Sequence, residues 1–329
     1  MVDVSVLNLV PVRAGKTMRD AISDMVVLAQ QVESFGYKRY WIAEHHNIGS
    51  LVSSATQLLV GHTLAQTERI RVGSGGVMLP NHNTLIVAEQ YGTLATIYPN
   101  RVDLGLGRAP GTDQMTAAAL RRNERDASIN FPEDVKQLQR YLGDAETQGF
   151  VRAYPGMGTN IPLYILGSST ESAYLAAEMG LPYVFAAHFA PRMLEMALEI
   201  YRSTFQPSAV LDKPKVMVCI NAILADTDEE AQFLATTQQQ FFLNIVRNAR
   251  QPLQQPVPSM EGLWSESEQK LAQQMLSCTL VGSQKTVAMQ FEQLHAELGA
   301  DEYMVVSYIY DINKQNESYR LLKPIIDAA

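Results

Sequence analysis

The sequence predicts an α/β protein, a single (β/α)8 TIM-barrel domain over residues 1–329 with insertions. Eight short apolar segments alternate with longer segments of helical periodicity almost from end to end, which is typical of a parallel barrel. With 47% hydrophobic residues among 329, the chain can bury one large core. The expected strands are Val4–Val10, Arg39–Ala43, Ile70–Ser74, Arg101–Gly107, Leu163–Leu166, Tyr183–Ala187, Val216–Leu224 and Glu302–Ile309.

Two of the helical segments carry clear start signals. Apolar residues recur at helical spacing over residues 18–32, and Thr17 and Asp20 just before them resemble a capping box. Between the third and fourth strands, Asn83 is placed to cap another helix. Both helices follow a strand, as a barrel requires.

Two segments interrupt the regular alternation. Residues 144–160 are rich in glycine and predict an irregular or hairpin excursion before the fifth strand. Residues 248–265 hold three prolines, so we expect a long loop after the helix at 228–247. This loop either folds over the barrel mouth as a lid, with Trp264 as an apolar tip, or lies solvated on the surface.

Composition excludes several classes of function. Twenty-six Lys and Arg against 34 Asp and Glu give a net charge of −8, without the basic stripe that nucleic-acid binding needs. No stretch of about 20 apolar residues predicts a membrane span, and the first residues do not resemble a signal peptide. We expect a cytoplasmic protein in which Cys219 and Cys278 are buried free thiols.

The second strand ends in an unusual group of polar residues. In a barrel the active site forms at the C-terminal ends of the strands, where this chain has Glu44, His45 and His46. A histidine there suits acid–base chemistry or hydrogen bonding to oxygen, although one of the two can be structural. No metal is expected, because successive strand residues face opposite sides and no second histidine cluster is evident.

Glycines follow the third strand, at Gly75 and Gly76. They permit a close approach of ligand and backbone, and conformations that other residues adopt only at a cost. We interpret this segment as a ligand-binding turn, with an ordinary turn as the alternative.

The fourth and fifth strands end in residues that suit an anion. Arg108 lies between Gly107 and Gly111, and Ser168 and Ser169 begin a helix. A guanidinium and the free N–H groups of a helix start can hold a phosphate together. The alternative for the serines is a capping box that involves Glu171 and needs no ligand.

Taken together, the motifs resemble a known family. The segments WIAEHH, VGSGGVMLPNH, RVDLGLGRAPGTD, LGSSTESAYLAAEMGLPYVFAAHFAP and MVVSYIYD resemble the bacterial luciferase-like flavin-dependent monooxygenases, in particular their stand-alone, single-gene branch. The resemblance covers nearly the whole chain. It implies that reduced FMN and O2 oxygenate a small organic substrate through a C4a-peroxyflavin, with an NAD(P)H-dependent flavin reductase as the supplier of reduced FMN.

The resemblance also implies roles for single residues. It places a cis peptide behind the flavin ring at Gly75–Gly76. The residues that match those around the FMN phosphate are Arg108, Ser168, Ser169 and Ser172.

On the catalytic side, His45 matches the histidine at the reactive face of the flavin, with Glu44 and His46 beside it. His188 resembles a pocket histidine without an assigned role. The reactive cysteine of light-emitting members falls on Gly107, so no thiol is expected beside the flavin C4a carbon, which weakens any claim of light emission.

Several alternatives stay open. The same fold can use a deazaflavin for hydride transfer, and some family members bind a flavin without turnover. The resemblance further implies a homodimer, for which Ala55, Leu58, Leu59 and Leu64 offer an apolar face. An aldehyde, an alkane, a sulfonate or a natural-product intermediate are all possible substrates.

Overall fold

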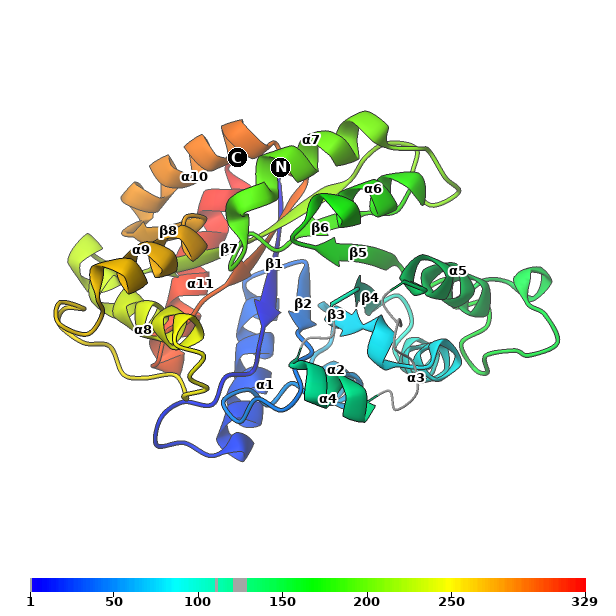
Figure 1. Cartoon of the computed structure of the whole chain (residues 1–329), viewed down its shortest axis with the longest axis horizontal. Coiled ribbons are helices and arrows are strands. Elements are labelled where there is room, and N and C mark those ends of the chain that lie inside the picture. Colours follow the sequence, from blue (N-terminus) through cyan, green and yellow to red (C-terminus); the bar gives the residue numbers. More distant parts are fainter. Residues whose placement is uncertain (1, 110–111, 121–128) are drawn as a thin grey trace.

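Eight parallel strands close into a barrel in the computed structural model, which describes residues 2–109, 112–120 and 129–329 (Figure 1). Going round the barrel, the order is β1-β2-β3-β4-β5-β6-β7-β9, and β9 pairs with β1 to close it. A ninth strand, β8, pairs with the end of β7. The bounds are β1 Asp3–Asn8, β2 Arg39–Ile42, β3 Arg71–Met78, β4 Val102–Gly107, β5 Leu163–Gly167, β6 Tyr183–Phe185, β7 Val216–Leu224, β8 Thr279–Gly282 and β9 Glu302–Val306.

Helices surround the barrel and cover its outer face. A large apolar cluster between strands and helices forms the outer core. No helix among the described residues is both long and apolar enough to cross a bilayer. The bounds are α1 Met18–Ser34, α2 Thr56–Ala65, α3 Thr84–Ile97, α4 Gln114–Leu120, α5 Phe131–Leu142, α6 Thr170–Glu178, α7 Leu194–Thr204, α8 Asp228–Val246, α9 Glu266–Met275, α10 Gln284–Leu298 and α11 Ile312–Asp327.

The eight expected strands and both expected helix starts are confirmed. Thr17 and Asp20 form the capping box of α1, and the Asn83 side chain accepts hydrogen bonds from the first turn of α3. The short strand β8, which among the described strands pairs only with the end of β7, was missed. Cys219 is a buried free thiol as expected, whereas Cys278 is only half-buried.

The sequence suggested a turn after the third strand at Gly75 and Gly76. The structure has no turn at these two residues. Strand β3 continues through them to Met78, and its pairing with β4 shifts register between Ser74 and Val77. Opposite them, β4 has Gly105, where an added Cβ would lie 2.4 Å from the Ser74 carbonyl oxygen. Only glycine therefore permits the two backbones to approach so closely.

Both interruptions of the alternation are irregular in the structure. Residues 144–160 contain one short 3-10 helix, Ala145–Thr147, and no hairpin. The 248–265 segment folds back over the strand ends: Leu253 pairs with the chain after β1, and Arg250 bonds to the Asn47 carbonyl after β2. Trp264 packs against the cluster of the barrel interior. Whether this segment acts as a lid stays a prediction.

The N-terminal end of the barrel interior holds a buried ion network. Arg39 on β2 bonds to Asp103 on β4 at 2.7 Å and to Glu302 on β9 at 2.7 and 3.0 Å. The carboxylates are fully buried and Arg39 is 2% exposed. Burial lowers the pKa of Arg39, but the two carboxylates raise it by more, so its pKa lies above the ordinary value and the guanidinium stays charged. Arg71 on β3 also binds Asp103, so two cations balance two anions.

Removing Arg39 tests this network. We expect R39A to lower the free energy of unfolding by about 3–5 kcal/mol, because it removes the cation that bridges the two buried carboxylates. The measurement is urea unfolding followed by tryptophan fluorescence and circular dichroism. The control is R69A, since the Arg69 side chain is 72% exposed; a loss of equal size in both variants would contradict the expectation.

Candidate active site

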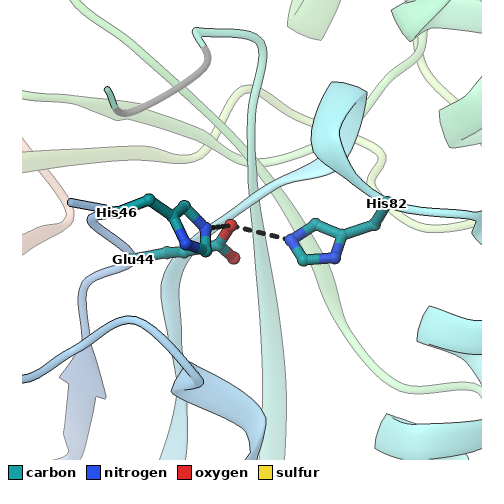
Figure 2. A group of neighbouring side chains, drawn as sticks. All are labelled: Glu44, His46 and His82. Carbon is teal, nitrogen blue, oxygen red and sulfur yellow. Dashed lines mark hydrogen bonds and ion pairs between the residues drawn. The ribbon is translucent and has the colours of Figure 1, made fainter. Parts of the chain in front are cut away.

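Glu44 and His46 lie just after β2, at the C-terminal end of the barrel, and a third residue joins them (Figure 2). The Glu44 side chain is 1% exposed, and its Oε1 lies 2.8 Å from His46 Nε2 and 2.7 Å from His82 Nε2. Burial raises the pKa of Glu44, but the hydrogen bonds and charges of the two histidines lower it by more, so the carboxyl is ionised at neutral pH. The Met78 amide also donates to Glu44 Oε2, at 3.3 Å.

His82 was missed as a site residue by the sequence reasoning. It follows the short 3-10 helix Leu79–Asn81 after β3, and only the NH at the end of VGSGGVMLPNH hinted at it. The expectation that no further histidine accompanies the pair was wrong, because chain reversal after β3 brings His82 back to β2. The three ligand atoms lie within 4.8 Å of one another and make a donor set that could hold a divalent metal. The absence of a metal stays a prediction.

His45 faces a different environment from its neighbours. Its Nδ1 atom is buried and has no hydrogen-bond partner among the described residues. Burial lowers the pKa of His45 to about 4, and the charge of Glu44 offsets this only in part. The imidazole is therefore neutral at pH 7, with one nitrogen that can donate and one that can accept.

His188, beyond the end of β6, shares this condition. It is 6% exposed, and its Nδ1 atom also lacks a partner. Burial lowers its pKa to about 3, and the charge of His45 contributes in the same direction. The charge of His45 thus acts on His188, although 142 residues lie between them in the chain.

The glycine segment of β3 packs against the barrel interior. The peptide bond between Gly75 and Gly76 is cis, as the resemblance implied. A Cβ atom on Gly75 would lie 2.6 Å from Leu7 and 3.1 Å from Trp41, whose side chain is fully buried. The backbone of β3 is thus packed against the filled interior of the barrel, and side chains larger than glycine have no room.

The expected phosphate residues lie at the ends of β4 and β5. Arg108 is exposed, and neither its guanidinium nor the Ser168 hydroxyl bonds to a described residue. Ser169 is the N-cap of α6, but its side chain does not cap the helix; it bonds to Glu171 instead. The capping box that would have explained these serines without a ligand is therefore not formed. Gly111 lies outside the described residues.

Two residues modify this picture. The hydrogen bond from Ser169, together with the charge of Arg108, lowers the pKa of Glu171, so a carboxylate lies near the guanidinium. Ser172 is buried, and its hydroxyl already bonds to the Ser169 carbonyl and to Tyr183. We therefore leave Ser172 out of the phosphate site, because its hydroxyl points into the packing between α6 and the barrel.

Comparison with known proteins now identifies the family. Residues 3–302 match the family described as luciferase-like monooxygenase. The chain belongs to this family. A protein of Escherichia coli K12 with the name luciferase-like monooxygenase is 48% identical over 317 residues, 96% of this chain and 95% of that protein. The chain is accordingly a flavin-dependent oxidoreductase of the luciferase-like type.

Solved structures agree with the barrel. The crystal structure of apo-MsnO8 superposes with a TM-score of 0.93 at 32% identity, covering 100% of this chain and 99% of the other. Two more distant structures share the fold alone. They are the oxygenating constituent of 3,6-diketocamphane monooxygenase from Pseudomonas putida in complex with FMN (TM-score 0.76, 17% identity, 98% and 96% covered) and an F420-dependent secondary alcohol dehydrogenase (0.70, 14%, 99% and 99%).

The bonding of Glu44 leads to a prediction about stability and pH. We expect E44Q to lower the free energy of unfolding at pH 7 by about 1–3 kcal/mol, since it removes a buried carboxylate that two histidines hold. The pKa of Glu44 is lower in the folded protein than in the unfolded chain. The stabilisation that its ionised carboxylate provides is therefore present above the ordinary glutamate pKa of about 4.3, and it is lost as the pH falls through the folded pKa.

The measurement is thermal and urea unfolding of the wild type and E44Q between neutral pH and about pH 3. The difference between their free energies of unfolding should narrow below about pH 4.3. The matched control is E133Q, because Glu133 is 64% exposed in its pair with Arg140. A gap that stays constant with pH would contradict the expected role of Glu44.

Proposed function

We propose that the protein is an FMN-dependent monooxygenase that uses reduced FMN from a separate NAD(P)H-dependent flavin reductase and O2 to oxygenate a small organic substrate. The observation that carries the proposal is the strand-end arrangement. On one side, Arg108 and Ser168 form no side-chain hydrogen bond to a described residue and the start of α6 has no side-chain cap; on the other, the neutral His45 has an Nδ1 atom without a partner among the described residues. Family membership and the FMN complex of a protein with the same fold support it.

The residues present suit a flavin mononucleotide. Arg108, Ser168 and the first amides of α6 offer donors for the phosphate. We place the flavin ring against the cis peptide Gly75–Gly76, as the resemblance implies. When bound, reduced FMN supplies the electrons that activate dioxygen for transfer of one oxygen atom. The chain holds the cofactor, and the 248–265 lid excludes water from the strand ends.

The role of His45 follows from its protonation state. A neutral, half-buried imidazole at the strand ends can donate a hydrogen bond or accept a proton without first losing one to solvent. Glu44, His46 and His82 hold the chain segment on either side of it. We assign His45 the direct proton and hydrogen-bond contacts, with Glu44 and His46 as positioning residues.

The homodimer is part of the proposal. Of the four residues expected on its face, Leu59 and Leu64 pack into the core, whereas Ala55 is exposed and Leu58 is 70% exposed. The exposed apolar surface on α2 is therefore smaller than the sequence suggested. A monomeric mass in light scattering would contradict the proposed homodimer.

The phosphate contact gives a test of the cofactor. We expect R108A to weaken FMN binding roughly tenfold to a hundredfold, equivalent to about 1.5–3 kcal/mol for hydrogen bonds to a charged group, and to leave riboflavin binding unchanged. E171Q should tighten FMN binding, because it removes the competing carboxylate. Flavin fluorescence titration measures both, with R69A as the control.

If R108A weakens riboflavin and FMN alike, Arg108 does not contact the phosphate. Titration with the deazaflavin F420 alongside FMN separates the two cofactor alternatives. We expect FMN to bind more tightly, and the reverse order would favour hydride transfer.

Oxygen chemistry gives the test of activity. Reduced FMN and protein are mixed without oxygen, and oxygen is then admitted in a stopped-flow spectrometer. We expect a near-ultraviolet absorbance band that outlives the oxidation of free reduced FMN and that decays faster in H45A. No such band, with H45A identical to the wild type, would contradict the monooxygenase proposal.

A further inference from the structure

Two side chains where β6 and β7 end have polar atoms buried without a partner. Asn221 on β7 is fully buried, and His188 beyond β6 is 6% exposed. Asn221 Oδ1 and His188 Nδ1 form no hydrogen bond within the described residues. Buried polar atoms are nearly always bonded to protein, water or ligand, so two such atoms on residues that contact each other are candidates for hydrogen bonds to a bound group.

The fold holds the two residues together. The Asn221 side-chain amide donates to the His188 main-chain carbonyl at 2.7 Å, and this bond fixes the rotamer that leaves Oδ1 free. Because side chains alternate along a strand, Asn221 lies on the same face of β7 as Met217 and Cys219. These two residues belong to the apolar cluster of the barrel interior. The free acceptor of Asn221 is therefore on the inner side of the barrel, at its C-terminal end.

The surroundings of this pair are apolar. The same interior cluster includes Phe242 of α8, Tyr308 beyond β9 and, partly buried, Trp264 of the lid. Phe241 stacks on Tyr308 with ring centroids 4.7 Å apart, so the wall is built of aromatic rings. Apolar walls with a few placed polar groups are typical of sites for small organic molecules.

The titratable groups here are uncharged at neutral pH. Burial lowers the pKa values of His188 to about 3 and of His45 to about 4, and it raises the pKa values of Cys219 and Tyr308. The carboxylate of Glu44 is bonded to His46 and His82. An anionic group placed against Asn221 would meet no cation among these residues and would lose its hydration.

We propose that His188 and Asn221 form a subsite for the neutral hydrogen-bonding group of an otherwise apolar compound, an alcohol or a primary amide. Asn221 Oδ1 accepts from the O–H or N–H of this group, and the His188 imidazole bonds to its oxygen. That this compound is the substrate rests on the proposed function; that it binds here does not. A sulfonate or carboxylate is thereby disfavoured at this end of the substrate.

Matched ligands test the subsite. The FMN-saturated protein is titrated by calorimetry with 1-octanol, octanamide, octanoate and octane-1-sulfonate, which share one chain length. We expect the two neutral compounds to bind at least tenfold more tightly than the two anions. H188F and N221L should each weaken octanamide binding at least fivefold, and H188Q, which keeps a polar group, should weaken it less.

The control is H295Q. His295 lies on the outer helix α10 and bonds to Tyr303 of β9, away from the strand ends that form the mouth. Melting temperature and FMN affinity are measured for each variant, so that a folding defect is recognised. Anions that bind as tightly as the amide, or octanamide affinity unchanged in H188F, H188Q and N221L, would overturn the subsite. Octanamide binding without FMN binding would instead contradict the proposed function and leave the subsite standing.

Discussion

The ion network of Arg39 with Asp103 and Glu302 is the constraint on which the barrel depends. It joins β2, β4 and β9 across the interior, and Ser5 and Tyr164 bring β1 and β5 into the same set of bonds. A buried charge is tolerable only when it is paired and fully bonded, so these strands cannot shift register independently. The network occupies the N-terminal end of the interior and leaves the C-terminal end for the site.

The two ends of the barrel therefore treat polar groups in opposite ways. At the N-terminal end the buried charges neutralise one another and leave no place for a ligand. At the C-terminal end His45, His188 and Asn221 each keep one buried polar atom that has no hydrogen-bond partner in the part of the chain that the structure describes. Such atoms weaken the fold slightly, and they are ready to bond to a bound molecule without first breaking a bond within the protein.

Charge is also divided around the mouth. Exposed Arg108 and the uncapped start of α6 lie at the ends of β4 and β5, where an anionic cofactor tail would remain close to water. The neutral, aromatic part lies at the ends of β6, β7 and β9, where Trp264 of the 248–265 segment packs against the same cluster. In the proposed function, this arrangement would separate a solvated phosphate from an apolar region near His45.

The sequence alone was sufficient for the barrel, for all eight of its strands though not for β8, for the caps at Thr17 and Asn83, and for the strand-end position of the candidate residues. These features depend on local periodicity, capping chemistry and the general geometry of parallel barrels, all of which are readable along the chain. The strand-end position of His45 could be predicted for the same reason.

Only the tertiary structure decided which polar groups meet and which remain free. His82 joins Glu44 and His46, Ser172 turns inward, Leu59 and Leu64 are buried, and His188 and Asn221 keep unpartnered atoms. Each outcome depends on contacts between residues that are distant in the chain or on the direction of one side chain. Such contacts arise from packing in three dimensions, which no local pattern of residues encodes.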